Sequence, residues 1–224
     1  MVLNGVAVSG RNVRIPVGAV TLEGDLHVGP KPAMVVFVHG SGSSRRSPRN
    51  TYVAGVLQNA GLGTLLFDLL TTDEERVDER TAHLRFDIGL LANRLDGATD
   101  WLVKQIGDVK IGYFGASTGA AAALVAAARK QDVIKAVVSR GGRPDLAGDL
   151  LDKVRAPTLL IVGGDDHPVI SMNQEALDKL KIRDKRIEIV PGATHLFEEP
   201  NKLEEVARLA RQWFERYLSD ERVT

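Results

Sequence analysis

The sequence predicts an α/β protein whose core is a mostly parallel twisted sheet of about eight strands, with helices on both faces. Short runs such as residues 33–38 are apolar at every position, which is typical of strands buried on both sides of a parallel sheet. Helical patterns alternate with these runs, and repeated β-α units imply parallel strands. A chain of 224 residues with 44% hydrophobic content buries one sizeable core, so we expect a single domain over residues 1–224.

The first expected elements are two extended segments, residues 12–17 and 19–28. Apolar and polar residues alternate through the second segment, as they do in a strand with one solvated face. Glycine and proline at positions 29–32 then break the chain before the buried run 33–38. The two segments therefore predict an antiparallel hairpin at an edge of the sheet.

Strands and helices alternate through the rest of the chain. The clearest helix is 84–106, because its apolar residues recur at steps of three and four along one stripe, as in a helix packed on a sheet. The other expected helices are 51–60, 120–130, 172–180 and 202–218, and the other expected strands are 62–67, 109–114, 133–139, 158–162 and 186–190.

Residues 115–119 read Gly-Ala-Ser-Thr-Gly and lie between the strand 109–114 and an alanine-rich run. This is the context of a G-x-S-x-G nucleophile elbow, a strand-to-helix turn so tight that a Cβ at either glycine would crowd its neighbours. The turn exposes the hydroxyl of Ser117 at the positive end of a helix dipole, which favours a developing oxyanion. The pattern thus indicates a nucleophilic serine.

Two later strand ends carry the residue types that such a serine requires. The strand 158–162 is followed by Gly-Gly-Asp-Asp-His-Pro-Val, and the strand 186–190 by Pro-Gly-Ala-Thr-His-Leu-Phe. The carboxyl ends of parallel strands lie at one edge of a sheet, so Ser117, an aspartate and His195 are expected to meet there. The chain order Ser, Asp, His is the order of a catalytic triad on this topology.

Together with His39-Gly40 after the strand 33–38, these motifs resemble the α/β-hydrolase superfamily, and more narrowly its dienelactone hydrolase-like branch of small uncapped serine esterases. The resemblance covers about residues 12–218. Too few residues separate the strands 133–139 and 158–162 for a helical lid, so no large cap domain is expected.

The resemblance also distinguishes between two adjacent aspartates. The acid turn of the family reads Gly-x-x-Asp-x-x-Val, and it matches this chain with Asp166 as the acid and Val169 closing the turn, which leaves Asp165 as a turn residue. Ser117 stands where dienelactone hydrolases proper have a cysteine, and the chain has no cysteine. A carboxylesterase is therefore favoured, with a lactone or other acyl hydrolase as the alternative.

The expected mechanism is ester hydrolysis through an acyl-enzyme. Ser117 attacks the carbonyl, His195 carries the proton, and Asp166 holds the imidazole in the required tautomer. The backbone N–H groups of Thr118 and Ser41 would form the oxyanion hole. No metal or organic cofactor is needed.

Gly42 is the fallback for the second oxyanion donor and a candidate substrate-binding residue. Arginines lie beyond the same loop and after the strand 133–139, and their planar fork suits an anionic substrate. Pairing with local acids is the other interpretation of these arginines. The arginines concerned are Arg45, Arg46, Arg49, Arg140 and Arg143.

Charge and cysteine content limit the partners. Lys+Arg and Asp+Glu are equal at 29 each, so no overall field favours nucleic acid or an anionic membrane, and a small-molecule ester is the expected partner. The sequence contains neither a signal-peptide pattern nor an apolar run long enough for a membrane span, and with no cysteine this suggests a cytoplasmic protein.

Two other functions stay open. Gly40-Ser41-Gly42 followed by Asp68 at the next strand end resembles part of a dinucleotide-binding fingerprint, although its third glycine is missing. A hydrolase-fold ligand sensor without catalysis is the second.

His39 is expected to be a structural histidine, hydrogen-bonded beneath the oxyanion loop.

Overall fold

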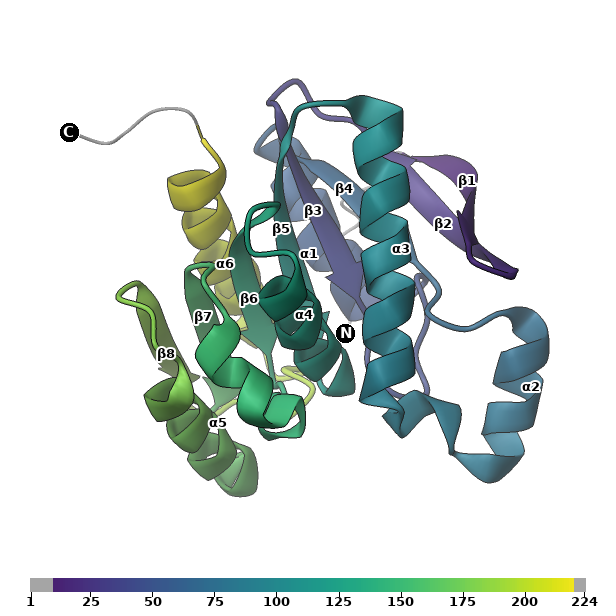
Figure 1. The fold of residues 1–224 in the computed structure, drawn as a ribbon. Helices are drawn as coiled ribbons and strands as arrows, with labels where there is room; N and C mark the ends of the chain where they lie inside the picture. The colour runs from purple at the N-terminus through teal and green to yellow at the C-terminus, as the bar shows by residue number, and fades with distance from the viewer. Residues whose placement is uncertain (1–9, 220–224) are drawn as a thin grey trace.

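The computed structural model describes residues 10–219, and a single eight-stranded sheet runs through it in the order β1-β2-β4-β3-β5-β6-β7-β8 (Figure 1). β1 pairs antiparallel with β2, β2 pairs antiparallel with β4, and all other neighbours are parallel. The predicted mostly parallel sheet with an edge hairpin is thus confirmed. The strands are β1 Arg11–Val17, β2 Val20–His27, β3 Ala33–Val38, β4 Gly63–Phe67, β5 Lys110–Ala116, β6 Ile134–Arg140, β7 Thr158–Gly163 and β8 Lys185–Val190.

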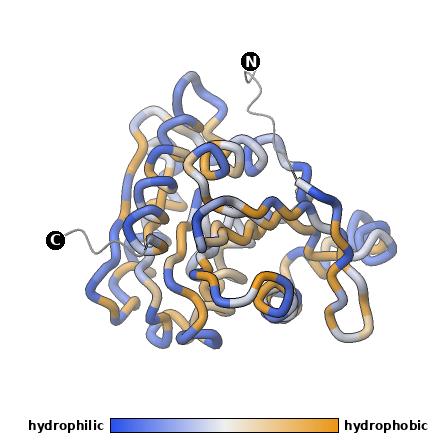
Figure 2. The backbone as a smooth tube through the Cα atoms, turned by 90° about the horizontal axis from the view of Figure 1, so that it is seen from above, coloured by the Kyte–Doolittle hydropathy of each residue, from blue (hydrophilic) through white to orange (hydrophobic). Residues whose placement is uncertain are grey.

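Helices cover both faces of this sheet. One hydrophobic cluster joins the sheet to α3, α4 and α5, and a second joins the opposite face to α1 and α6. Hydrophobic residues follow the strands and the helix faces between these layers, whereas the outer turns are hydrophilic (Figure 2). The helices are α1 Pro48–Asn59, α2 Thr72–Thr81, α3 Ile88–Ile106, α4 Thr118–Arg129, α5 His167–Lys179 and α6 Lys202–Leu218, with short 3-10 segments η1 Leu84–Phe86 and η2 Pro144–Lys153.

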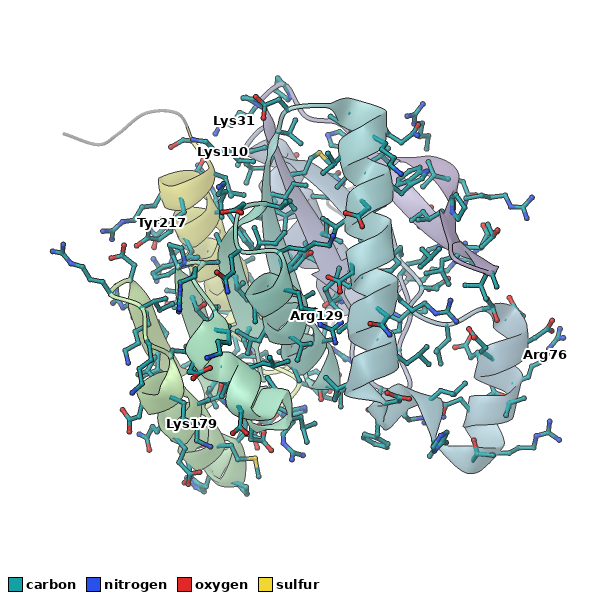
Figure 3. The ribbon with its side chains drawn as sticks, in the orientation of Figure 1. Lys31, Arg76, Lys110, Arg129, Lys179 and Tyr217 are labelled. Carbon is teal, nitrogen blue, oxygen red and sulfur yellow. The ribbon has the colours of Figure 1, made fainter. Side chains whose placement is uncertain are left out.

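The α4 helix is built from small residues, and this lets it lie directly against the sheet. Every residue from 118 to 128 is buried. The last residue of α4 is Arg129. Its guanidinium donates hydrogen bonds to Asn93 at 2.9 Å and to Asp96 at 3.1 Å, both on α3. Figure 3 shows Arg129 beside α3 and α4. The helix that follows the elbow is therefore fixed on one side by the sheet and on the other by α3.

Two helices begin four or more residues away from their predicted starts. The predicted helix 84–106 is interrupted, because Asp87 caps α3 by accepting a hydrogen bond from Leu90 N at 2.9 Å, and residues 84–86 form the separate segment η1. The predicted helix 172–180 begins five residues earlier, at His167, since Pro168 fits the first turn of a helix, where no N–H donor is required.

Two segments, α2 and η2, were not predicted. Thr71 and Glu74 form a capping box at the start of α2, yet its one buried residue is Asp78, so the segment lacks the apolar stripe that periodicity detects. α2 lies beyond α3 at the side of the molecule (Figure 1), and its Arg76 extends outward from it (Figure 3). Across residues 10–219, none of the helices has both the length and the apolar character needed to cross a membrane.

A buried hydroxyl pair connects α3 to the central strand β5. Thr99 Oγ1 donates to the Leu95 carbonyl at 2.8 Å, so the Tyr113 hydroxyl, 2.7 Å away, must donate to Thr99 Oγ1. Both side chains are fully buried. Burial also raises the pKa of Tyr113 far above its ordinary value. The Tyr113 hydroxyl is therefore neutral and depends on Thr99 as its acceptor.

We expect Thr99→Val to destabilise the protein more than Tyr113→Phe. The valine leaves the buried Tyr113 hydroxyl without its acceptor, at a cost of about 1–3 kcal/mol, whereas the phenylalanine leaves Thr99 bonded to Leu95 and costs about 1 kcal/mol. Urea unfolding of both variants, with Thr99→Ser as the control that keeps the hydroxyl, measures the difference. A Tyr113→Phe cost equal to or above that of Thr99→Val would contradict this account of the pair.

Candidate active site

Ser117 lies at a strained turn between β5 and α4. Its φ of +51° and ψ of −122° are values that side-chain-bearing residues rarely adopt, at a cost of about 1–3 kcal/mol. Glycines on both sides make the turn possible: a Cβ at Gly115 would lie 2.5 Å from Ala120 Cα, and one at Gly119 would collide with the Val38 carbonyl oxygen. The geometry is that of a nucleophile elbow, with the serine at its apex.

His195 contacts Asp166 and not Asp165. His195 Nδ1 lies 2.7 Å from Asp166 Oδ2, and the Asp166 side chain is mostly buried while that of His195 is 38% exposed. Asp165 is exposed, and its backbone N–H donates to the Ala193 carbonyl at 3.0 Å. The turn after β7 therefore directs one of the two aspartates to the histidine that follows β8.

The backbone at the end of β6 brings the serine and the histidine together. Ser117 N donates to the Arg140 carbonyl at 3.2 Å. A Cβ at Gly141, the next residue, would lie 3.5 Å from His195 Cε1 and Nδ1. The Ser117 backbone and the His195 side chain therefore both lie against residues 140–141, at the carboxyl edge of the sheet.

His39 is hydrogen-bonded through both ring nitrogens. The Leu69 N–H donates to Nε2 at 3.1 Å, so the ring proton is on Nδ1, which faces the Gly40 carbonyl at 3.0 Å. Burial lowers the pKa of His39. The neutral imidazole therefore holds the start of the loop after β3, in agreement with the structural role expected from the sequence.

The loop after β3 approaches the elbow closely. A Cβ at Gly40 would lie 2.9 Å from Ser117 Cβ. The Ser41 N–H, one of the expected oxyanion donors, donates to Thr118 Oγ1 at 3.0 Å, and Thr118 is buried. This contact between the two expected donor residues depends on a side-chain rotamer, and no sequence pattern indicated it.

A cavity of about 250 Å³ lies beside this loop. Its walls come from the loop itself, the end of β4, α2 and η1. Asp78 fixes the side chain of Arg85 in this wall: the Arg85 Nε donates to Asp78 Oδ2 at 2.6 Å. Burial alone would raise the pKa of Asp78, but hydrogen bonds from Arg85 and Leu84 lower it overall. Sequence reasoning missed this pair because α2 was not predicted.

Most of the arginines near the site are paired with acids. Arg143 forms a two-pronged contact with Asp145, at 2.9 and 2.7 Å. Arg45 donates to Asp68 from both its guanidinium and its backbone N–H. Both carboxylate oxygens of Asp68 therefore accept hydrogen bonds from Arg45. A dinucleotide-binding site would need this carboxylate unpaired to bind the ribose, so the pairing argues against that interpretation. Arg140 differs from these arginines, since it is buried and forms no ion pair within residues 10–219.

No group of three or more His, Cys, Asp or Glu side chains could hold a metal ion in the part of the chain from 10 to 219. The polar groups gathered at this edge of the sheet are Ser117, His195 and Asp166, together with backbone N–H groups at the start of α4 and in the loop after β3. These groups are suited to acyl transfer, in which a hydroxyl attacks a carbonyl and a histidine carries the proton.

Comparison with known families and curated proteins gives two results. A family model described as "Dienelactone hydrolase family" matches residues 20–219. Two Mycobacterium tuberculosis proteins, from strains CDC 1551 and H37Rv, are each 58% identical over 206 residues and are named "Putative phosphoribosyl transferase". The match covers 90% of this chain but 45% of each relative, so the chain spans about half the length of these proteins.

Among solved structures, a dienelactone hydrolase from Anabaena variabilis is 60% identical, with a TM-score of 0.92 over 94% of this chain and 98% of that one. XC6422 from Xanthomonas campestris, described as a serine hydrolase without lid, has a TM-score of 0.76 at 20% identity, over 96% and 98% of the two chains. Est1E from Butyrivibrio proteoclasticus has a TM-score of 0.77 at 18% identity, over 92% and 98%. XC6422 and Est1E therefore share the fold of this chain.

We expect His39 to make stability depend on pH. Because burial lowers the pKa of His39 below its ordinary 6.5, the unfolded chain binds a proton below that pH that the folded chain does not. Proton binding therefore favours the unfolded chain below pH 6.5. The free energy of unfolding is unaffected by His39 above pH 6.5, and it decreases by up to about 1.4 kcal/mol per pH unit as the pH falls from 6.5 toward the folded-state pKa.

Chemical denaturation between pH 5 and 8 tests this expectation. The slope of the free energy of unfolding against pH should be shallower in His39→Gln than in the wild type. His83→Gln, which changes an exposed histidine, is the control and should keep the wild-type slope. Parallel profiles for the wild type and His39→Gln would show that His39 titrates equally in both states.

Proposed function

Because the chain belongs to the dienelactone hydrolase family, we propose that it is a serine hydrolase that cleaves small carboxylic esters through Ser117, His195 and Asp166. The observation that carries the proposal is the 2.7 Å contact between His195 Nδ1 and Asp166 Oδ2, at the sheet edge where Ser117 lies. A carboxylate on Nδ1 leaves Nε2 as the atom that accepts a proton from the serine hydroxyl.

The proposed reaction has two halves. Ser117 Oγ attacks the ester carbonyl carbon while its proton passes to His195 Nε2, and the resulting tetrahedral intermediate expels the alcohol, which takes that proton. A water molecule then attacks the acyl-enzyme with His195 again as the base, releasing the carboxylic acid and restoring Ser117. Asp166 stays ionised and stabilises the imidazolium formed in each half.

The proposed oxyanion donors are the N–H groups of Thr118 and Ser41, with Gly42 as the fallback. Thr118 is the first residue of α4, where an N–H has no partner within the helix. The Ser41 N–H donates to Thr118 Oγ1, so a substrate oxygen would compete with that hydroxyl for it. A hydroxyl both donates and accepts, so Thr118 can turn its own hydrogen toward the oxyanion as the exchange occurs.

A lactone is a second candidate substrate. The Anabaena variabilis protein, 60% identical to this chain, is named a dienelactone hydrolase, and a lactone is a cyclic ester. The same residues would open it by the same steps, with the leaving alcohol remaining attached to the acyl group. Ser117 in place of the cysteine expected of dienelactone hydrolases proper favours ordinary esters as the first class to test.

The phosphoribosyl transferase name belongs to proteins of which this chain covers 45%. The region in common with them is largely the one that matches the dienelactone hydrolase family. The residues described here therefore support acyl transfer rather than phosphoribosyl transfer.

The proposed partner is a small-molecule ester, because the equal counts of 29 basic and 29 acidic residues favour neither nucleic acid nor an anionic membrane.

Ser117→Ala should lower kcat for p-nitrophenyl acetate by about a thousandfold or more, since no other group in the site replaces the nucleophile. Ser171→Ala, on an exposed position of α5, is the matched control and should retain wild-type activity. A p-nitrophenyl series from acetate to octanoate, measured on the wild type, gives the acyl preference. Full activity in Ser117→Ala would refute the serine mechanism.

The two adjacent aspartates provide a matched pair of variants. Asp166→Asn should lower kcat by about 10³ to 10⁴, because an amide no longer fixes the reactive tautomer of His195. Asp165→Asn should change kcat less than threefold, since that side chain is exposed and its N–H contact to Ala193 is unaffected. Steady-state kinetics on one ester decides between them, and comparable losses in both variants would remove the assignment of Asp166.

A further inference from the structure

Asn173 is a buried polar residue to which the proposed mechanism gives no role. It lies on α5, about two helical turns beyond Asp166, and is fully buried. Its side-chain Nδ2 donates two hydrogen bonds, one to the Gly142 carbonyl at 3.0 Å and one to the Val169 carbonyl at 2.7 Å. Its Oδ1 accepts no hydrogen bond from any of residues 10–219.

Asparagine is a costly residue for this position. It is a weaker helix former than leucine, and it buries an acceptor that has no donor. The Val169 carbonyl, one turn earlier in α5, has the backbone N–H of residue 173 as its regular helical partner. The contact that only a side chain at this position supplies is therefore the one to Gly142.

Gly142 belongs to the turn after β6, residues 140–143, and this turn lies against the nucleophile elbow. Ser117 N donates to the Arg140 carbonyl at 3.2 Å, and Arg143 N donates to the Ser117 carbonyl at 3.1 Å. A Cβ at Gly142 would lie 2.6 Å from an alanine Cβ on α4. The turn after β6 therefore packs directly against the helix that follows the serine, with no room for a side chain between them.

The same turn also lies against the proposed histidine. A Cβ at Gly141 would lie 3.0 Å from the His195 carbonyl oxygen and 3.5 Å from its ring Nδ1. On α5, the Val169 N–H donates to the carbonyl of Asp166, the residue that caps this helix, at 3.0 Å. The Asn173 amide thus joins the helix that carries the acid to the turn that borders the other two residues of the site.

We propose that Asn173 is a positioning residue, whose amide fixes the turn after β6 relative to α5 and thereby aligns Asp166, His195 and Ser117. The inference rests on the proposed function for the reaction that this alignment serves. A displacement of about 1 Å in such a group can lower the rate about a hundredfold. Because Asn173 is buried behind the turn, its loss should slow the reaction and leave substrate binding unchanged.

Asn173→Leu keeps the branched shape of the side chain and removes its N–H donors. At a temperature where the variant is fully folded by circular dichroism, kcat for p-nitrophenyl acetate should fall at least tenfold while KM stays within twofold of the wild type. Thr158→Val is the matched control. It removes another buried donor, which bonds the Ala156 carbonyl at 2.9 Å, but at the opposite edge of the sheet, and it should keep the wild-type kcat.

Asn173→Thr separates a role within the helix from a role toward the turn. A threonine hydroxyl bonds the carbonyl one turn back, but it is one bond shorter than the amide and does not span to Gly142. Asn173→Thr should therefore lose kcat as Asn173→Leu does, and it carries the test if the leucine variant does not fold. Wild-type kcat in either folded variant would overturn the proposal.

Proton NMR gives a measurement that does not depend on hydrolysis. A proton shared between His195 Nδ1 and the Asp166 carboxylate gives a downfield resonance, which is assigned by its loss in His195→Gln. This resonance should move upfield or broaden in Asn173→Leu and stay in place in Thr158→Val. An unchanged resonance in Asn173→Leu would refute alignment of the acid and the histidine by this amide.

The Ser117→Ala variant separates a failure of this inference from a failure of the proposed function. If Ser117→Ala hydrolyses the ester as fast as the wild type but the resonance still responds to Asn173→Leu, the serine mechanism fails and the positioning of His195 by Asn173 stands. If Ser117→Ala is inactive while Asn173→Leu has the wild-type kcat and resonance, the positioning role alone fails.

Discussion

The strained backbone at Ser117 is the constraint on which the rest of the site depends. A residue with a side chain keeps a φ of +51° only where its surroundings allow no other conformation. Here β5 and the closely packed α4 impose that conformation on Ser117. Small residues along α4 allow the helix to lie against the sheet, and Gly119 lets it touch the end of β3. The position of the serine is thus set by the packing of the core.

The titratable side chains of the site differ in whether they have hydrogen-bond or ion-pair partners. His39 is neutral and bonded at both nitrogens, and Asp166 faces His195, so these groups need nothing further to be stable. Arg140 is the opposite case, because it is buried with a second cation nearby and pairs with no acid among residues 10–219. The backbone carbonyl of Arg140 accepts the Ser117 N–H, so this buried cation belongs to the strand that borders the nucleophile elbow.

The features that could be predicted from the sequence were those that periodicity and chain order determine. Buried runs gave the strands, the G-x-S-x-G pattern marked the turn at Ser117, and strand ends identified where Asp166 and His195 would lie; their catalytic roles remain predictions. What could not be predicted depends on side-chain contacts. The polar helix α2 has no apolar stripe, the Ser41 contact to Thr118 depends on one rotamer, and which arginines have acids beside them is decided only by tertiary packing.

The attachment of α2 sets it apart from the other helices. Its one buried residue is Asp78, and it is held by the ion pairs of Asp78 with Arg85 and of Glu74 with Arg94 rather than by an apolar face. Water can replace such bonds more easily than it can replace a packed core, so we expect α2 to unfold locally at a lower free energy than the sheet. Because α2 forms one wall of the cavity beside the oxyanion loop, the size of the molecules admitted there is adjustable in evolution by surface substitutions that never touch the core.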